Sequence, residues 1–437
     1  MLSEISQKAE KEISKYCEDY EIYIEKEKSF QFDAQKSNLE FVKEEINIGI
    51  GIRAIVDNKL GFAYTSDMEK IESLAENAFS NAKLGGEDEN FCFAEKSKLA
   101  KVEGIYDSSF ENLDIEECAG FLKSIIDICE EEQCEPTSGG FQAASDEKLI
   151  LNSNGVSATS KSTGFSTYIA VNAERNGEKS TAYDGVSSCF FDLDGEKLAK
   201  DTCQIAKDSI GGVNVETGDM NVVLDYHAVS GLLSTFISGF NADNVQRGRS
   251  TLQNKLGEKI VEDNLSIYDD GTFAGGLNSC ACDDEGVFSE KTTLVENGVL
   301  NNFIYDLYTA KKANDENITT SSNGFRGSYA STPSVSPSNV IFDFSEKVDI
   351  SEIDNGFLAT DVLGAHTANP ISGDFSVEAN NAFLIDGGEI GEPIKKAMIS
   401  GNIFNALSNC EGINSEIKQL GPFIIPKFLV KDLRVVG

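Results

Sequence analysis

Alternating apolar and polar residues mark several long segments in the first half of the chain. The alternation runs through 20–24, 30–34 and 46–54, and strand-like segments return from about 140 to 191. A period of two places every second side chain on the same face of a sheet, so these segments are predicted to be strands. The short connections at 36–38 and 57–59 favour antiparallel hairpins.

Helical spacing of apolar residues, at i, i+3 and i+4, marks four other segments of this half. They are 1–17, about 69–84, about 115–132, and the stretch that contains Leu198, Ala199, Cys203 and Ala206. Each apolar stripe predicts an amphipathic helix that covers the sheet. Little periodicity remains over 211–218, where we place a domain boundary. We therefore expect an α+β domain over residues 1–215.

The second half is predicted to consist mostly of strands with one prominent helix. Val222-Val223-Leu224 is typical of a short buried strand, and apolar residues then follow a helical period from Val229 to Phe240. Asn297-Gly298 and Asp386-Gly387-Gly388 predict hairpin turns. We expect a β-rich domain over 216–437, a mostly antiparallel sheet or barrel that carries this key helix. The polar stretch 319–337 is predicted to be a long functional loop.

Two glycines interrupt the strand with the clearest alternation. Gly49 and Gly51 lie between the isoleucines, on the opposite face of the strand. A strand glycine indicates either close approach of another part of the protein, or a bulge or a packed helix. The latter two are the more common causes.

The charge balance narrows the classes of partner. Asp and Glu number 73 against 37 Lys and Arg, for a formal net charge of −36. Such a field repels nucleic acids and anionic membranes as general partners. No signal peptide is predicted at the N-terminus, and no run of about 18 apolar residues predicts a membrane span. We therefore expect a cytoplasmic protein whose ten cysteines are free thiols.

A series of motifs in the second half has a specific order. The series is Arg247-Gly248-Arg249-Ser250, Leu256-Gly257-Glu258, Asp269-Asp270-Gly271-Thr272, Asp283-Asp284-Glu285-Gly286, Ser372-Gly373-Asp374-Phe375-Ser376 and Ile399-Ser400-Gly401-Asn402. Together with Gly49-Ile50-Gly51-Ile52-Arg53 in the first half, it resembles the TldD/PmbA family of peptidases. In the catalytic branch of that family the key helix carries a His-Glu-x-x-x-His zinc motif. The matching turn here is Ser234-Thr235-Phe236-Ile237-Ser238-Gly239.

The resemblance is therefore to the PmbA (TldE) branch, which lacks the zinc motif. It implies a non-catalytic subunit of a cytosolic metallopeptidase complex that degrades short or unfolded peptides. It also implies no cofactor in this chain and a zinc ion in a TldD-type partner subunit. An extended peptide adding to a strand edge through backbone hydrogen bonds would explain weak sequence preference.

Few residues in the chain could act as catalytic groups or metal ligands. Its two histidines, His227 and His366, could hold a metal with Cys280 and Cys282 only in an atypical arrangement, and we favour plain packing of the two cysteines. No catalytic residue and no metal ligand is therefore predicted. The alternatives to a subunit role are a self-sufficient peptidase with an atypical site and a non-proteolytic binding or scaffold homodimer.

Six charged residues are the candidates for binding substrate or partner: Arg247, Arg249, Arg326, Asp283, Asp284 and Glu285. Arginine binds carboxylates through two parallel hydrogen bonds, so the three arginines could anchor a peptide or a partner subunit. Structural ion pairs explain them equally well. The three acids could act in acid–base chemistry or hold a hard cation. A solvated turn ending at Gly286 is the interpretation we favour for them.

Overall fold

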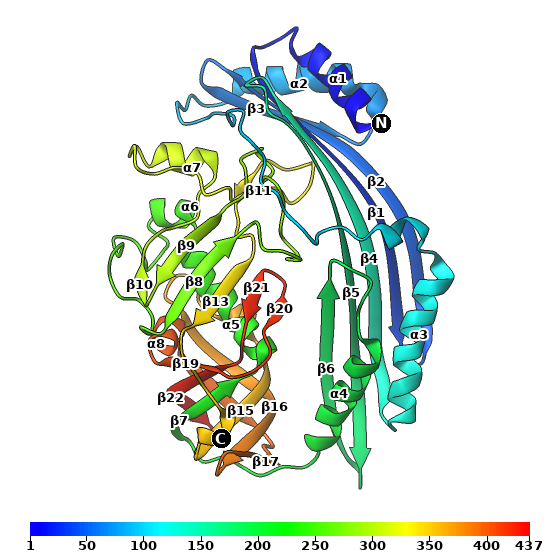
Figure 1. Cartoon of the computed structure of the whole chain (residues 1–437), viewed down its shortest axis with the longest axis vertical. Helices are drawn as coiled ribbons and strands as arrows, with labels where there is room; N and C mark the ends of the chain where they lie inside the picture. Colours follow the sequence, from blue (N-terminus) through cyan, green and yellow to red (C-terminus); the bar gives the residue numbers. More distant parts are fainter.

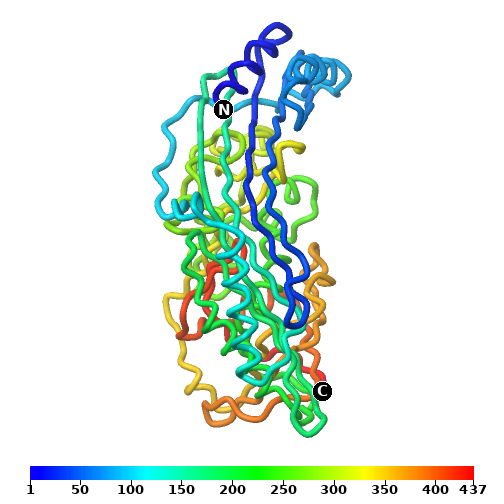
Figure 2. The backbone as a smooth tube through the Cα atoms, turned by 90° about the vertical axis from the view of Figure 1, so that its right-hand side faces the viewer, coloured from blue at the N-terminus to red at the C-terminus, as the bar shows by residue number.

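The computed structural model describes residues 1–437. Its N-terminal half is built on one long, curved, fully antiparallel sheet of six strands in the order β3-β2-β1-β4-β5-β6 (Figure 1). The strands are β1 (Asp19–Gln35), β2 (Asn38–Val56), β3 (Lys59–Thr65), β4 (Glu135–Asn152), β5 (Ser157–Arg175) and β6 (Glu178–Ser188). Figure 2 shows the β1–β2 hairpin, in blue, running along most of the molecule.

Four helices cover one face of this sheet in two pairs. The helices α1 (Leu2–Ile13) and α2 (Ile71–Leu84) pack on one end, over the isoleucines of β1 and β2. Two more, α3 (Ile115–Glu131) and α4 (Gly195–Asp208), pack on the other end over a phenylalanine-rich core. The alternation within the strands produces both cores, because every second residue of β1 points toward the helices.

The C-terminal half holds a closed five-stranded barrel and a second sheet. The barrel consists of β7 (Gly218–Leu224), β15 (Asn355–Leu363), β16 (Asp374–Asp386), β18 (Ala397–Asn402) and β22 (Phe428–Val436), and it closes because β22 also pairs with β7. The second sheet contains β10 (Val299–Leu300), β9 (Lys291–Glu296), β8 (Leu265–Asp270), β13 (Val340–Phe344), β21 (Phe423–Ile425) and β20 (Lys418–Leu420). Shorter elements are α6 (Ala242–Gln246), α7 (Leu307–Lys312), α8 (Ile403–Leu407), β11 (Gly324–Phe325), β12 (Ser334–Val335), β14 (Lys347–Val348), β17 (Glu389–Pro393) and β19 (Cys410–Ile413).

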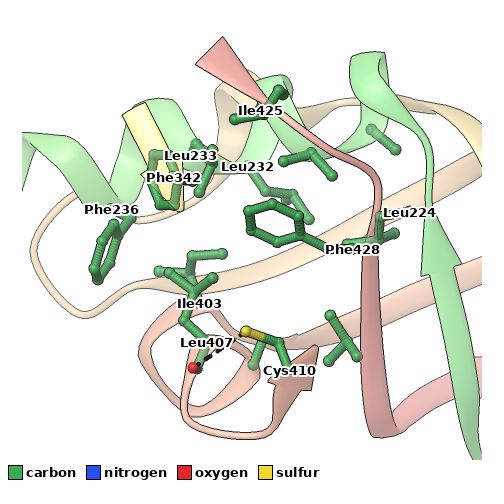
Figure 3. Close-up of a cluster of buried hydrophobic side chains, with 14 of the residues drawn as sticks. Leu224, Leu232, Leu233, Phe236, Phe342, Ile403, Leu407, Cys410, Ile425 and Phe428 are labelled. Atoms are coloured by element: carbon green, nitrogen blue, oxygen red, sulfur yellow. Dashed lines mark hydrogen bonds between the residues drawn. The ribbon is translucent and has the colours of Figure 1, made fainter. Parts of the chain in front are cut away.

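Helix α5 (Tyr226–Ile237) lies between the barrel and the second sheet. Leu232, Leu233 and Phe236 point into a core shared with Phe342 and Phe428 (Figure 3). Each such side chain contributes roughly 1.5–3 kcal/mol when fully buried. The helix is therefore fixed from both sides, and its orientation decides which of its residues reach the surface.

The predicted fold class is confirmed: helices cover the N-terminal sheet, and the C-terminal half is β-rich with one buried helix. The turns at Asn297-Gly298 and at Gly387-Gly388 are present, with positive φ at all four residues. The predicted loop 319–337 contains two short paired strands, β11 and β12. No helix in the structure combines the length and hydrophobicity needed to cross a membrane.

The two halves come into close contact at the strand glycines. A Cβ at Gly51 would lie 2.6 Å from the backbone oxygen of Tyr329, and one at Gly49 would lie 2.3 Å from the Tyr329 ring. The less common of the two interpretations, close approach, is therefore the correct one. The approaching segment is the loop between β11 and β12, which packs against β2.

We predict that Gly51→Ala destabilises the protein by about 1–3 kcal/mol, because the added methyl overpacks against a backbone atom that cannot rotate away. A matched control is Gly120→Ala within α3, where a Cβ meets nothing within 4 Å. This control should be neutral or stabilising by up to about 1 kcal/mol, because alanine favours a helix over glycine. Denaturant unfolding of both variants measures the difference. Equal stabilities would contradict the proposed contact.

Candidate functional site

The turn of α5 that matches the zinc motif presents hydroxyl and apolar side chains. Thr235, Phe236 and Ile237 are buried, and Ser234 is exposed. The Ser234 hydroxyl donates to the Ser230 carbonyl at 3.4 Å, and the Ser238 hydroxyl donates to the Thr235 carbonyl at 2.7 Å. Zinc sites in proteins use Cys, His, Asp and Glu ligands. The residues of this turn therefore do not fit a zinc ion.

The remaining metal donors of the chain are not brought together. His366 is exposed in a short 3-10 helix (Ala365–Thr367), Cys280 is 3.5 Å from the Ser289 hydroxyl, and Cys282 is buried among apolar side chains. No group of three or more His, Cys, Asp or Glu residues is arranged to hold a metal ion. The atypical site considered from the sequence is therefore not assembled. None of the ten cysteines is in a disulfide.

His227, in the first turn of α5, pairs with an acid on the N-terminal sheet. Its Nε2 lies 2.7 Å from Oδ1 of Asp184 on β6, and both side chains are about three-quarters buried. Burial lowers the pKa of His227, but the bond to Asp184 outweighs burial and raises it above the usual value. The pair links the two halves of the chain. His227 has no other hydrogen-bonding partner, so no Ser or Cys nucleophile is activated by it.

A buried network of charges joins the two halves at a second contact, separate from the His227–Asp184 pair. Glu21 on β1 and Arg53 on β2 face each other across the hairpin, joined by two hydrogen bonds of 2.9 and 2.7 Å. Arg53 also donates to Glu285 of the C-terminal half at 3.3 Å. Arg326, again from the C-terminal half, donates to Glu21. All four residues are at least nine-tenths buried.

Further bonds extend this network on both sides of the contact. Lys148 of β4 lies 3.1 Å from Asp284, and the Tyr329 amide donates to Glu25 of β1 at 3.0 Å. Within the C-terminal half, the Arg326 amide donates to the other oxygen of Asp284 at 2.9 Å. We call these residues (Glu21, Glu25, Arg53, Lys148, Asp284, Glu285, Arg326 and Tyr329) the interdomain charge network.

The predicted solvated turn at Asp283-Asp284-Glu285 is wrong in one respect. The chain does turn here, with φ of 82° at Gly286, but all three acids are almost fully buried. Asp283 accepts hydrogen bonds from the amides of Gly324, Glu285 and Val287, each at 3.0 Å. Burial raises the pKa of Glu285 to about 7, and Arg53 opposes this effect. The reason for the error is that the N-terminal sheet covers this turn.

Arg247 and Arg249 lie apart from the network, at the end of α6. The side chain of Arg247 is exposed and forms an ion pair of 2.8 Å with Asp243, one helical turn earlier. Arg249 is exposed and forms no ion pair. Of the three candidate arginines, only Arg326 is in the network. The other two remain available at the surface for a ligand or partner.

Sequence reasoning missed the partners that the N-terminal half contributes. Glu21 and Arg53 are on the polar face of strands whose other face is apolar, and a hairpin alignment places them opposite each other. That alignment could have identified the pair. It could not have shown that the pair is buried, because the covering segment lies more than 200 residues away in the sequence.

Family models match most of the chain. The model of the PmbA/TldA metallopeptidase C-terminal domain matches residues 217–437, that of domain 1 matches 20–82, and that of the central domain matches 108–210. The chain belongs to the TldD/PmbA family. The α5 turn and the interdomain charge network are thus features of one member of this family.

Individual relatives within the family agree over nearly the full length. The uncharacterized protein MJ0231 of Methanocaldococcus jannaschii is 35% identical, covering 94% of this chain and 95% of the relative. A metalloprotease of Methanothermobacter thermautotrophicus is 26% identical, covering 87% and 84%. The crystal structure of TldE from Thermococcus kodakarensis has the same fold, with a TM-score of 0.92 at 23% identity, covering 99% of this chain and 100% of that one.

We predict that Arg326→Ala lowers the free energy of unfolding by about 3–5 kcal/mol, because Glu21 loses a partner while it stays buried. Arg247→Ala is the matched control, and it should cost less than about 1 kcal/mol because its ion pair is exposed. Chemical denaturation of both variants makes the comparison. A small effect of Arg326→Ala, equal to that of the control, would refute the structural role of the network.

A second prediction concerns pH. Burial, reinforced by Glu27, Glu25 and Asp284 and opposed by Lys148, raises the pKa of Asp146 from 3.8 to about 6. As the pH rises, the unfolded chain loses the Asp146 proton first, while the folded protein still holds it. The contribution of Asp146 to the free energy of unfolding therefore falls as the pH rises through about 6. Asp146→Asn should stabilise the protein by about 1–2 kcal/mol near pH 8 and hardly at all near pH 4. Unfolding measured at both pH values tests this, and a pH-independent effect would contradict it.

Proposed function

We propose that this chain is a non-catalytic, TldE-like subunit of a cytosolic metallopeptidase complex that degrades short or unfolded peptides. The observation that carries the proposal is the α5 turn, where hydroxyl and apolar side chains stand at the positions matched to the zinc motif. The names of the family models and of the Methanothermobacter relative support a link to metallopeptidases. The proposal assigns the zinc ion to a TldD-type partner chain.

The partner would supply the chemistry and this chain would supply a surface that positions the peptide. A protein-bound zinc ion can lower the pKa of a bound water to roughly 7, which makes the water a nucleophile at neutral pH. Positioning matters as much, because a misplacement of about 1 Å can cost on the order of a hundredfold in rate. A chain whose halves are joined by a buried charge network is suited to hold a peptide in a fixed place.

Arg247 and Arg249 are the proposed contacts to a peptide carboxylate or to the partner subunit. Both guanidinium groups are exposed on one short segment, and only Arg247 has a partner within the chain. Asp283, Asp284, Glu285 and Arg326 were also candidates for direct binding. Asp284, Glu285 and Arg326 are buried in the interdomain charge network, and Asp283 is buried next to Asp284. We therefore propose that these four residues act on a ligand only by holding the two halves in place.

The alternative of a self-sufficient peptidase has one observation in its favour, the His227–Asp184 pair. A histidine oriented by a carboxylate is part of many nucleophilic sites. Such a site also needs a hydroxyl or thiol in hydrogen-bond contact with the histidine, and here the only partner of His227 is Asp184. The subunit role therefore accounts for more of the structure.

The test is peptide hydrolysis by this chain alone, by a TldD-type chain from the same genome alone, and by the mixture, together with elemental analysis. This chain should contain no stoichiometric zinc and should not cleave unfolded peptides. The mixture should cleave them, and a chelator should abolish the activity. Cleavage by this chain alone that resists the chelator, or one zinc ion per chain, would contradict the proposal.

Single and double variants test which residues of this chain the activity of the mixture depends on. Arg247→Ala/Arg249→Ala should reduce the activity of the mixture without unfolding the chain, because both side chains are exposed. Ser234→Ala should leave the activity nearly unchanged, because no nucleophile is proposed on α5. A mixture inactivated by Ser234→Ala would favour the self-sufficient peptidase instead.

A further inference from the structure

Residues 85–107 form a strap that connects α2 to the short 3-10 helix Ser108–Asn112. Figure 1 shows it, in blue and cyan, as a thin trace between the two halves. The Asn152 side chain of β4 donates to the Ala94 carbonyl at 2.8 Å, and the Ala100 amide donates to the Ala281 carbonyl of the C-terminal half at 3.2 Å. The stretch 95–99 between these two bonds therefore spans the line where the halves meet.

A cavity of about 120 Å³ lies at this stretch. It is lined by Lys96, Ser97 and Leu99 of the strap, by residues 155–158 around the turn between β4 and β5, and by Gly286 of the C-terminal half. Its volume is that of about four water molecules in the liquid, which is enough for a small organic molecule. Small-molecule sites occur preferentially at contacts between domains.

The cavity has an apolar floor and a polar rim. Val156 and Ala158 of the floor are 4% and 3% exposed, and they belong with Leu99 to one apolar cluster. The rim carries the exposed side chains of Lys96, Ser97 and Ser157. None of these three has a hydrogen-bond or ion-pair partner within the chain, whereas Lys101 of the same strap pairs with Glu103 at 2.5 Å. One ammonium group and two hydroxyls are therefore free to bind a ligand.

The charges around the cavity favour an anion with a single charge. No Asp or Glu lines the cavity. The two acids next to it in sequence have partners elsewhere: Glu95 accepts from the Asn154 side chain at 3.3 Å, and Glu285 accepts from Arg53 and from the Leu307 amide. The net charge of −36 opposes any anion at long range, and it opposes a phosphate dianion more than a carboxylate.

We propose that this cavity binds a small carboxylate with a short aliphatic tail. The carboxylate accepts from Lys96, Ser97 and Ser157, and the tail lies on the apolar floor. A free aliphatic acid and the C-terminal residue of a peptide share this chemistry. The inference does not depend on the proposed subunit function, because every residue in it belongs to this chain.

The test is a ligand-detected NMR titration of the full chain with isovalerate. We expect saturable binding with a Kd of about 1 mM or lower, as is typical of a ligand of about seven non-hydrogen atoms. Isovaleramide lacks the charge and inorganic phosphate lacks the tail, so each should bind at least about tenfold more weakly. N-acetylvaline distinguishes the two sources: binding as tight as that of isovalerate assigns the site to the C-terminal residue of a peptide, and much weaker binding assigns it to a free acid.

Variants of the full chain test the position of the ligand. Lys96→Met should weaken isovalerate binding by about tenfold, because a hydrogen bond to a charged group is lost. Lys98→Met is the matched control: it removes the same charge from the strap at a residue that does not line the cavity, and it should have little effect. Ser157→Ala should weaken binding by about threefold. Ala158→Leu should abolish binding because the larger side chain fills the cavity, and its unfolding curve shows whether the fold is kept.

Four results would overturn the proposal. They are no saturable binding up to about 20 mM isovalerate, well above the expected Kd; isovaleramide or phosphate binding as tightly as isovalerate; equal effects of Lys96→Met and Lys98→Met; and normal binding by a folded Ala158→Leu variant. The lysine variants keep the test decisive if Ala158→Leu does not fold, because both side chains are exposed.

Discussion

The need to neutralise buried charge at the contact between the two halves is the constraint on which the rest of the structure depends. Arg326 and Glu285 belong to the C-terminal half, and their only ion-pair partners, Glu21 and Arg53, lie on the N-terminal sheet, so each would be an unpaired buried charge if that partner were displaced. An isolated ion in a protein interior costs several kcal/mol, so the halves are stable together only where these groups meet. The glycines at 49 and 51 permit that position, because any side chain there would hold the loop at Tyr329 away from β2.

Much of the fold could be predicted from local patterns. The period of two in β1 and β2 and the helical stripes of α2 and α3 are strong because each element packs one apolar face into a core. The barrel was harder to predict, since its closure depends on β22 pairing with β7, two strands at opposite ends of the second half. A short strand gives no sequence signal for a partner that is more than 200 residues away.

The candidate site, like the fold, could be predicted from the sequence only in part. Sequence reasoning identified Arg326 and the acids at 283–285 as unusual, but it placed the acids in solvent. Their burial results from the curvature of the N-terminal sheet over the C-terminal half, a tertiary property that turn chemistry does not report. Arg247 and Arg249, named from the sequence as candidates for binding a substrate or partner, are exposed at the end of the short helix α6. The chemistry of the α5 turn, in contrast, follows from residue identity alone.

Membership of the TldD/PmbA family connects the fold, the α5 turn and the interdomain charge network. The chain keeps the TldD/PmbA fold, including the helix held between barrel and sheet, and the turn of that helix that matches the zinc motif carries no side chain suited to zinc. The interdomain charge network joins the two halves of this fold through buried ion pairs. A surface that holds a peptide in a fixed place therefore requires the two halves to move as one body.

Hydrogen exchange at the Tyr329 amide tests this point most directly. That amide belongs to the C-terminal half and donates to Glu25 of the N-terminal sheet. If the halves separate only when the chain unfolds, the amide exchanges as slowly as the barrel amides of Val223 and Ile399, and with the same dependence on denaturant. Exchange that is orders of magnitude faster than that of the barrel, in the intact native protein, would show that the halves open independently and would contradict the account.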